Sequence, residues 1–429
     1  MHIHLLGIAG TKTAPLAVNL KNQGHFVSGS DQLKIYPPVS TILEKADISI
    51  NNTPINHHID LAIIGNSYLY FENTKKEFSE IQKLKIPYIS YTDYLINHLI
   101  KPNSILVAGS YGKTTITGLL SYIFSNLKLD PSYMFGGEAV DNLFPTRFGH
   151  SDWSIIEADE NHNGLDTQTT FLYYPVKYLI ITSTEWEHKD SFSSAQENLN
   201  AYRQLIRHVP KNGLIIYNGH DSNLVKIIKS SQAKIVNYQN NQIFDSKLIG
   251  FHNQQNIAAA FTLCSEIGLN TTNVLKAIST FSGIKRRLEL IGQKNNVLVY
   301  DDFAQSATRV KSALEALKYS YPQHQLKIYF EPHASFLQNR NSIKEFEIIN
   351  NLFSDFVLGK ISFSRNTIKT SRVTARDWQN VIPNLRYFPL SENIIKYYSS
   401  SLKSGDILIH FSSGGLEGLN NLKTVYNLI

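Results

Sequence analysis

Apolar and polar residues alternate with two distinct periodicities along residues 1–101. Short apolar runs bounded by turn-forming residues are typical of strands, whereas apolar residues that recur every three to four positions are typical of amphipathic helices. The pattern predicts strands at His2–Leu6, His25–Ser28, Leu61–Gly65 and Pro87–Ser90, and helices at Lys12–Gln23 and Lys75–Lys83. Strands and helices in alternation favour a parallel, doubly wound sheet.

The same alternation starts again at two points farther along the chain. Ile100-Lys101-Pro102-Asn103 is predicted to be a linker, because proline interrupts both helices and sheets. A strand and a helix are predicted after it at Ser104–Ala108 and Thr114–Leu127. Beyond Phe281-Ser282-Gly283-Ile284 the pattern predicts strands at Val297–Tyr300, Lys327–Phe330 and Ile407–Phe411. We therefore expect three α/β domains, at residues 1–101, 102–284 and 285–429.

Composition and charge narrow the class of protein. A single cysteine, Cys264, excludes a disulfide framework and suggests a cytoplasmic location. The N-terminal MHIHLLGIAG lacks the pattern of a leader peptide, and no window approaches about 18 apolar residues, so we expect no membrane association. The net charge of +6 favours anionic partners. The basic residues are scattered, and their densest cluster is Lys285-Arg286-Arg287. We therefore expect the anionic partner to be a phosphorylated small molecule and not a nucleic acid.

The strongest local motif is Gly109-Ser110-Tyr111-Gly112-Lys113-Thr114-Thr115, which lies between a predicted strand and a predicted helix. Glycines let backbone N–H groups turn toward a phosphate, and the dipole of the following helix favours negative charge. Lys113 supplies a charge for the β- and γ-phosphates of a nucleotide, and the Thr114 hydroxyl can ligate Mg²⁺. We predict that these phosphates are bound by Gly109, Ser110, Gly112, Lys113, Thr114 and Thr115. The spacing of the first glycine departs from G-x-x-x-x-G-K-[ST], and the alternative is a plain glycine turn that opens a helix.

Acidic residues and a histidine follow the next two predicted strands. Ile155-Ile156 leads into Glu157-Ala158-Asp159-Glu160, and Leu179–Thr182 leads toward Glu185-Trp186-Glu187-His188. Side chains at the carboxyl ends of parallel strands point into the crevice where open α/β sheets bind ligands. Since Mg²⁺ prefers oxygen ligands, Glu157 or Glu160 is its predicted carboxylate, and His188 is a further candidate that could instead orient a water or the acyl phosphate. We predict Lys113, Glu157 and His188 as catalytic residues.

The N-terminal glycines outline a nucleotide half-site. Gly7-Ile8-Ala9-Gly10 follows the first strand, and Ser30-Asp31 ends the second. The full G-x-G-x-x-G is absent, because position 9 is alanine and position 12 is lysine. A dinucleotide cofactor is therefore disfavoured, and the alternative is a tight strand–helix turn.

Taken together, these motifs resemble those of the Mur ligase family of peptidoglycan enzymes, nearly from end to end. Further segments carry the likeness: Gly250-Phe251-His252-Asn253-Gln254-Gln255-Asn256 is similar to the family's G-x-H-N-x-x-N helix, and Phe281–Glu289 to its hinge motif. The resemblance implies Rossmann-like first and third domains around a central P-loop ATPase-like domain. It also implies ATP contacts from His252, Asn253, Asn256, Arg287, Asp301 and Asp302, and UDP-sugar contacts from Gly7, Gly10, Ser30, Asp31 and Asn66.

Within the family, Ser30-Asp31 with Tyr36–Thr41, Asp166–Tyr174 and Phe411–Gly418 resemble the branch that attaches the tripeptide L-Ala-γ-D-Glu-meso-diaminopimelate to UDP-N-acetylmuramate. The implied enzyme is an ATP- and Mg²⁺-dependent ligase that works through an acyl phosphate, as a monomer or weak homodimer. The alternatives are the branch that adds L-alanine to the same sugar nucleotide, and a non-catalytic nucleotide-binding relative. Departures from the pattern are Tyr111, where relatives carry histidine, and Gln305-Ser306-Ala307 in place of His-His-Pro.

Overall fold

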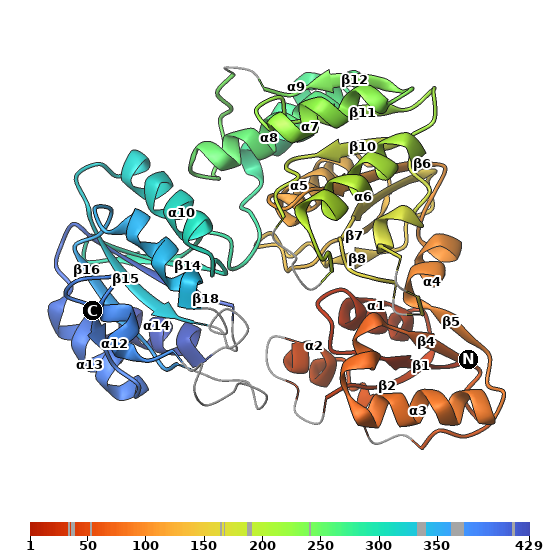
Figure 1. Cartoon of the computed structure of the whole chain (residues 1–429), viewed down its shortest axis with the longest axis horizontal. Helices are drawn as coiled ribbons and strands as arrows, with labels where there is room; N and C mark the ends of the chain where they lie inside the picture. The colour runs from red at the N-terminus through yellow and green to blue at the C-terminus, as the bar shows by residue number, and fades with distance from the viewer. Residues whose placement is uncertain are drawn as a thin grey trace. The chain divides into compact units, whose positions relative to one another are not determined.

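The computed structural model in Figure 1 describes residues 1–32, 35, 39–51, 54–163, 165–166, 168–186, 191–239, 242–332, 340–361, 373–413 and 417–429. It comprises two compact units. The first consists of Met1–Lys247 and Gln254–Gly283, and the second of Leu248–Asn253 and Ile284–Ile429. Among the described residues, no helix is long and apolar enough to cross a membrane.

The N-terminal part of the first unit is a parallel sheet in the order β3-β2-β1-β4-β5. Its elements are β1 (His2–Leu6), α1 (Thr13–Asn22), β2 (Phe26–Ser30), α2 (Val39–Lys45), β3 (Ser49–Ile50), β4 (Leu61–Ile64), η1 (Asn66–Tyr70), α3 (Glu72–Lys83), β5 (Tyr88–Ser90) and α4 (Tyr91–His98). Proline fits α1 because Pro15 lies in its first turn, where the missing N–H has no helical acceptor. The strand order reverses beside β1, so the turn after this strand opens into the crevice that such sheets use for ligands.

The rest of the first unit is built on a second sheet, in the order β12-β11-β10-β6-β9-β7-β8. All of its strand pairs are parallel except β7 with β8. Its elements are β6 (Asn103–Ala108), α5 (Lys113–Asn126), β7 (Ser132–Met134), β8 (Thr146–Arg147), β9 (Trp153–Glu157), η2 (Thr170–Leu172), β10 (Tyr178–Ile181), α6 (Ala195–His208), β11 (Leu214–Tyr217), α7 (Ser222–Ile227), η3 (Ile228–Ser230), β12 (Lys234–Asn237), α8 (Phe251–Glu266) and α9 (Thr271–Thr280). Strand β6, which precedes the glycine-rich loop, lies between β9 and β10.

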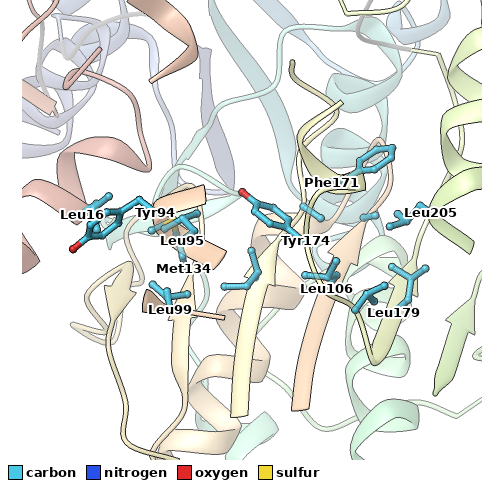
Figure 2. Packing of buried hydrophobic residues seen from close by; sticks show 14 of the residues in the cluster. Leu16, Tyr94, Leu95, Leu99, Leu106, Met134, Phe171, Tyr174, Leu179 and Leu205 are labelled. Carbon is cyan, nitrogen blue, oxygen red and sulfur yellow. The ribbon is translucent and has the colours of Figure 1, made fainter. Parts of the chain in front are cut away.

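One apolar cluster is shared by the two sheets of the first unit. It joins side chains of the N-terminal sheet and its helices, such as Leu16 and Leu95, to side chains of the second sheet, such as Leu106 and Leu179. Figure 2 shows this cluster extending from Leu16 and Tyr94 through Tyr174 to Leu205. A shared core restricts movement of one sheet relative to the other, because such movement would expose apolar surface to water.

The second unit contains a third sheet, in the order β13-β14-β18-β15-β16-β17. Among the strand pairs formed by the described residues of this unit, β13 with β14 is antiparallel and the others are parallel. Its elements are β13 (Glu289–Lys294), β14 (Val297–Asp302), α10 (Ala307–Ser320), β15 (Gln325–Glu331), α11 (Arg340–Lys344), η5 (Glu345–Ile349), β16 (Asp355–Leu358), α12 (Ala375–Gln379), β17 (Arg386–Tyr387), α13 (Ser391–Ser401), β18 (Asp406–Ser412) and α14 (Glu417–Leu428). Aromatic side chains around the fully buried Trp378 fill the core on one face of the sheet.

The predicted fold class is confirmed, since three largely parallel sheets carry helices in alternation with their strands. The predicted helix Lys12–Gln23 is shorter than expected: Lys12 and Gln23 are its N-cap and C-cap. The sequence pattern also missed the shortest strands, such as β3 and β17, because two residues are too few to show a period. The domain boundaries after residues 101 and 284 remain predictions.

Candidate active site

The glycine-rich loop follows β6 and is held against the end of β10. Gly109 has φ +121°, and a Cβ there would lie 2.2 Å from Thr182 Oγ1, so only glycine fits. The Thr182 hydroxyl donates to the Tyr111 carbonyl at 2.5 Å, and the Ser110 hydroxyl donates to the Glu185 carbonyl at 2.5 Å. These bonds fix the loop before any ligand arrives, which reduces the entropy lost when a phosphate binds.

Helix α5 begins directly after this loop. Its N-cap is Gly112, which has φ +79° and no side chain with which to cap the helix. The N–H groups of the first turn of a helix lack acceptors within that helix and carry the positive end of its dipole. Lys113, Thr114 and Thr115 form this turn and are all buried. The arrangement suits an anion such as a phosphate.

Lys113 is held by carbonyl and carboxylate oxygens at this turn. Its ammonium donates to Gly109 O at 2.6 Å and to the two Glu160 carboxylate oxygens at 3.0 and 2.7 Å. Tyr202 on α6 donates its hydroxyl to Glu160 at 2.5 Å. Burial, followed by the nearby Glu160 carboxylate, raises the pKa of Tyr202 well above its ordinary value, so this phenol keeps its proton. The predicted phosphate-binding lysine is therefore neutralised by Glu160 in this structure.

Thr114 and Glu157 place two side-chain oxygens, of the kind that bind Mg²⁺, next to each other beside the loop. The Thr114 hydroxyl donates to Glu157 Oε1 at 3.0 Å, and the Gly136 N–H donates to Glu157 Oε2 at 2.5 Å. Mg²⁺ at nucleotide sites takes one or two protein oxygens and completes its shell with phosphates and water. The pair fits that requirement, although the described residues include no cluster of three or more metal-ligating side chains. Of the two predicted carboxylates, Glu157 lies against the predicted Thr114 ligand, whereas Glu160 is bonded to Lys113.

The third predicted catalytic residue, His188, lies outside the described residues, as do Glu187, Lys189 and Asp190. The same holds for parts of the predicted branch motifs at residues 36–38, 167 and 414–416. The role of each stays a prediction.

Lys12 was not predicted to belong to this site, yet its side chain reaches the carboxylates after β9. Its ammonium donates to Asp159 Oδ2 at 2.5 Å and to the Glu157 carbonyl at 3.1 Å, and it lies 4.0 Å from Glu157 Oε1. Although burial alone would lower the pKa of Lys12, the charges of Asp159 and Glu157 raise it above its ordinary value. Lys12 therefore remains an ammonium ion.

The predicted sugar-nucleotide residues meet at the carboxyl ends of β1, β2 and β4. Gly7 has φ +77° and donates its N–H to the Ser30 carbonyl at 2.8 Å. Asp31 accepts from the N–H of Ala9 at 2.8 Å, and burial raises the pKa of this carboxyl. Asn66 follows the adjacent strand β4 and donates to the His162 carbonyl at 3.4 Å. Gly10 completes the turn before α1, where a Cβ would approach Thr13 Oγ1 to 2.4 Å. Binding of a UDP-sugar by these residues stays a prediction.

The residues of α8 that are predicted to contact ATP lie on its first turns. Asn256 belongs to the first unit and lies against the glycine-rich loop, since a Cβ at Gly112 would be 2.3 Å from Asn256 Oδ1. His252 and Asn253 belong to the second unit, where Asn253 donates to the Ile249 carbonyl at 2.9 Å. Burial lowers the pKa of His252 to about 4, which leaves its imidazole neutral at pH 7. Contact between these residues and ATP stays a prediction.

The second unit places Asp301 and Asp302 at the carboxyl end of β14, together with buried charges that were not predicted. Asp301 accepts from Arg286 Nε at 3.0 Å and contacts His410 Nδ1 at 2.6 Å. His410 Nε2 lies 3.6 Å from Glu331 Oε2 and has no hydrogen-bond partner among the described residues. Burial raises the pKa of Asp302 to about 6. Of the two hinge arginines, Arg286 is thus bound to Asp301 inside its unit.

Arg287, the predicted phosphate ligand, has its guanidinium 5.4 Å from the centre of the Phe303 ring. Its charge also acts to lower the pKa of the neighbouring Asp302 carboxyl, against the larger effect of burial. Binding of the ATP phosphates by Arg287 stays a prediction.

The His410 cluster predicts a pH dependence of stability. Burial lowers the pKa of His410, but the hydrogen bond to Asp301 and the charge of Glu331 outweigh it, so the pKa lies above its ordinary value. Such a histidine stabilises the fold fully below its unfolded pKa of about 6.5 and loses that contribution as pH rises through its folded pKa. We expect the free energy of unfolding to fall above pH 6.5 with a slope of at most about 1.4 kcal/mol per pH unit from this group.

Denaturant unfolding of the wild type and of His410→Gln between pH 6 and pH 9 measures this effect. The variant should lose the slope, whereas His324→Gln, which changes a half-exposed histidine of the same unit, should keep it. An unchanged slope in His410→Gln would show that another group titrates.

Comparison with known proteins identifies the family. Residues 2–100 match the catalytic domain of the Mur ligase family, and residues 107–245 match the Mur ligase middle domain. The chain is 31% identical to the UDP-N-acetylmuramate–L-alanyl-γ-D-glutamyl-meso-2,6-diaminoheptandioate ligase of Escherichia coli K12, over 74% of this chain and 76% of that protein. The chain belongs to the Mur ligase family. Members of this family are ATP-dependent ligases that form amide bonds, so the chain is an ATP-dependent ligase of peptidoglycan precursors.

Other members of the Mur ligase family match nearly the whole chain. The UDP-N-acetylmuramate–L-alanine ligase of Desulfitobacterium hafniense is 28% identical over 97% of this chain and 98% of that protein. The solved murein peptide ligase of Psychrobacter arcticus has a TM-score of 0.71 at 24% identity and covers 100% of this chain and 99% of its own. The UDP-N-acetylmuramate–alanine ligase of Thermotoga maritima has a TM-score of 0.79 at 18% identity, covering 100% and 98%. These two structures share the fold of this chain.

Proposed function

We propose that this Mur ligase joins the tripeptide L-Ala-γ-D-Glu-meso-diaminopimelate to UDP-N-acetylmuramate and converts ATP to ADP and phosphate. The observation that carries the substrate assignment is the 31% identity with the Escherichia coli tripeptide ligase over 74% of this chain, against 28% over 97% of this chain with the L-alanine ligase of Desulfitobacterium hafniense. The motifs at Ser30-Asp31 and Asp166–Tyr174 also support this branch of the family. Such a reaction belongs to cell-wall recycling, because the tripeptide is a fragment of finished wall.

The nucleotide part of the proposal rests on the geometry of the loop after β6. The first turn of α5 offers N–H groups to the phosphates, and Lys113 adds a positive charge beside them. Because Lys113 is bonded to Glu160 in this structure, an incoming phosphate would compete with that carboxylate for the ammonium. Thr114 and Glu157 would hold Mg²⁺, which would neutralise charge on the transferred phosphoryl group.

The chemistry follows from the weak reactivity of a free carboxylate. An oxygen of the muramate carboxylate attacks the γ-phosphorus, the bond to the β,γ-bridging oxygen breaks, and ADP departs with the electron pair. The acyl phosphate formed in this way has a good leaving group. The neutral α-amine of the tripeptide then attacks the acyl carbon, phosphate leaves, and the amide is formed. Preorganised N–H groups and cations stabilise the charge that develops in both steps.

We assign one substrate to each predicted domain. Residues 1–101 bind the UDP-sugar, residues 102–284 bind ATP, and residues 285–429 bind the incoming peptide. The first assignment is supported by the turn at Gly7 and Asp31, and the second by the loop at Lys113. The carboxyl end of the third sheet, where Asp301 lies, is the corresponding position for the third assignment.

Release of phosphate by purified protein tests the proposal. The reaction contains Mg²⁺-ATP and UDP-N-acetylmuramate, with either the tripeptide or free L-alanine as the amine. We expect the tripeptide to stimulate release and to yield a UDP-linked product with the mass of the muramoyl-tripeptide. Stimulation by L-alanine alone would contradict the tripeptide assignment.

Addition of L-alanine is the second candidate, because L-alanine ligases match this chain over 97% of its length. It uses the same ATP and sugar-nucleotide sites, so only the amine distinguishes the two reactions. The non-catalytic alternative is not retained, since members of the family are ligases.

A further inference from the structure

Lys12 occupies a position where nucleotide-binding turns of this type carry a glycine. It stands at the third glycine of G-x-G-x-x-G, and it is the N-cap residue of α1, where its side chain makes no capping hydrogen bond. The side chain is only 15% exposed. The positive charge of this lysine is therefore largely buried, and it does not cap the helix that the residue begins.

The ammonium of Lys12 contacts residues at the end of β9 and in the loop that follows it. The ammonium contacts Asp159 Oδ2 at 2.5 Å and the carbonyl of Glu157 at 3.1 Å. It also lies 4.0 Å from Glu157 Oε1, the oxygen that accepts from Thr114. Gly136 packs beside it, since a Cβ there would lie 3.4 Å from Lys12 Cε. The turn assigned to the sugar nucleotide thus contributes a cation to the carboxylate assigned to the metal.

Phosphoryl transfer to a carboxylate requires two anions to come within bonding distance. Charges on the γ-phosphate and on the attacking carboxylate repel each other, so cations must stand on both sides of the reacting atoms. Lys113 stands on the nucleotide side, in the phosphate loop. Lys12 comes from the turn assigned to the sugar nucleotide, which carries the carboxylate.

We propose that Lys12 binds the sugar's carboxylate and neutralises it as the acyl phosphate forms. This inference rests on the proposed function. In the structure Asp159 and Glu157 hold the ammonium near the reaction centre, and the substrate carboxylate exchanges places with Asp159 as its partner. Lys12 keeps its proton throughout: the carboxylate oxygen forms the bond to phosphorus, and ADP takes the electron pair of the bond that breaks.

A purely structural role is the main competing explanation. An ion pair between Lys12 and Asp159 would also tie the turn before α1 to the loop after β9. The two explanations differ for the partner residue: Asp159→Asn removes the ion pair but leaves the ammonium available to a substrate. A structural role predicts equal damage from Lys12→Met and Asp159→Asn, whereas the proposed role predicts damage mainly from Lys12→Met.

Positional isotope exchange in ATP measures acyl-phosphate formation without any amine. ATP with ¹⁸O in the β,γ-bridge is incubated with Mg²⁺, UDP-N-acetylmuramate and the full-length protein, and scrambling of the label is followed by ³¹P NMR. We expect Lys12→Met to lower the exchange rate by about 100-fold, the effect typical of losing one group that stabilises transition-state charge. The dissociation constant for ADP should stay within about fivefold of wild type, because Lys12 is assigned to the sugar's carboxylate and not to the nucleotide. The dissociation constant for UDP-N-acetylmuramate should rise, because its ion pair with Lys12 is lost, so exchange rates are compared at saturating UDP-N-acetylmuramate.

Three variants control this measurement. Lys12→Arg keeps the positive charge and should recover at least about a tenth of the wild-type exchange rate. Asp159→Asn should lose less than about tenfold. Lys21→Met is the matched control, since Lys21 lies at the other end of α1 and contacts Asp47 at the surface, and it should exchange label like wild type.

Each outcome bears on a different claim. If the wild-type protein exchanges the label and Lys12→Met does so at a similar rate, the role proposed for Lys12 is wrong. The proposed function is then unaffected. Equal losses in Lys12→Met and Asp159→Asn, together with a lowered melting temperature, also overturn it in favour of the structural role. Absence of exchange in the wild-type protein overturns the proposed function itself.

Discussion

Replacing Lys113 by alanine is expected to lower the rate of ATP-dependent ligation by about a thousandfold or more. Lys113 is the buried cation of the phosphate loop, with its ammonium 2.6 Å from Gly109 O. A water molecule in the space left by the ammonium would not restore the rate. A fixed charge interacts more strongly with the γ-phosphate than water does where the effective dielectric constant is low. Steady-state release of phosphate measures the effect, and Lys128→Ala, at an exposed position just beyond the same helix, is the control that should retain activity.

A loss of folding must be separated from this loss of chemistry. Removal of Lys113 leaves Glu160 buried without its cation, and breaking a buried ion pair costs about 3–5 kcal/mol. The double variant Lys113→Met with Glu160→Gln removes both charges and should recover most of that stability while remaining inactive. Wild-type activity in a folded Lys113 variant would contradict the assignment of the phosphate loop.

Replacing Glu157 by glutamine is expected to lower turnover about 100-fold and to raise the Mg²⁺ concentration for half-maximal rate at least tenfold. The reason is the loss of the carboxylate that faces Thr114 at 3.0 Å. Glu160→Gln is the matched control, because this carboxylate is bonded to Lys113 and Tyr202. It should slow the reaction without changing its Mg²⁺ dependence.

Initial rates over a series of Mg²⁺ concentrations distinguish the two glutamates. Titration of Mg²⁺-ADP binding by calorimetry supplies a second measurement that does not depend on turnover. If Glu160→Gln rather than Glu157→Gln shifted the Mg²⁺ dependence, the carboxylate assigned to the metal would be wrong.

Local patterns along the sequence predicted the fold and the centre of the site. The apolar strands and amphipathic helices indicated parallel sheets, and the carboxyl end of a strand is a general location for ligands. That rule led to the choice of Glu157, which in the structure accepts a hydrogen bond from Thr114 of the glycine-rich segment. Its role as a metal ligand stays a prediction. Binding of ATP phosphates by the loop at Gly109–Thr115 stays a prediction.

The residues that the sequence analysis did not predict contact partners that are far away in the sequence. Lys12 contacts a carboxylate 147 residues away, and His410 contacts Asp301 across 109 residues. No periodicity reveals such partners, because they are set by which strands become neighbours. One signal was present for Lys12: a charged residue at a position that favours glycine needs a partner elsewhere in the fold.

The departure at Gln305-Ser306-Ala307 illustrates a different limit. The structure begins α10 at Ala307, so the absent proline does not prevent this helix from forming. Gln305 donates to the Glu331 carbonyl at 3.3 Å and thereby links the ends of β14 and β15. The sequence alone shows that the family's histidines are missing, but it does not show which contacts replace them.

A one-pot competition tests the central claim most directly. Equal concentrations of the tripeptide and L-alanine are supplied to the wild-type protein with Mg²⁺-ATP and limiting UDP-N-acetylmuramate, and the UDP-linked products are separated by mass. The proposed function predicts that UDP-muramoyl-tripeptide predominates by at least about tenfold, because the amine is selected through differences in transition-state binding. A product pool dominated by UDP-muramoyl-L-alanine would contradict it.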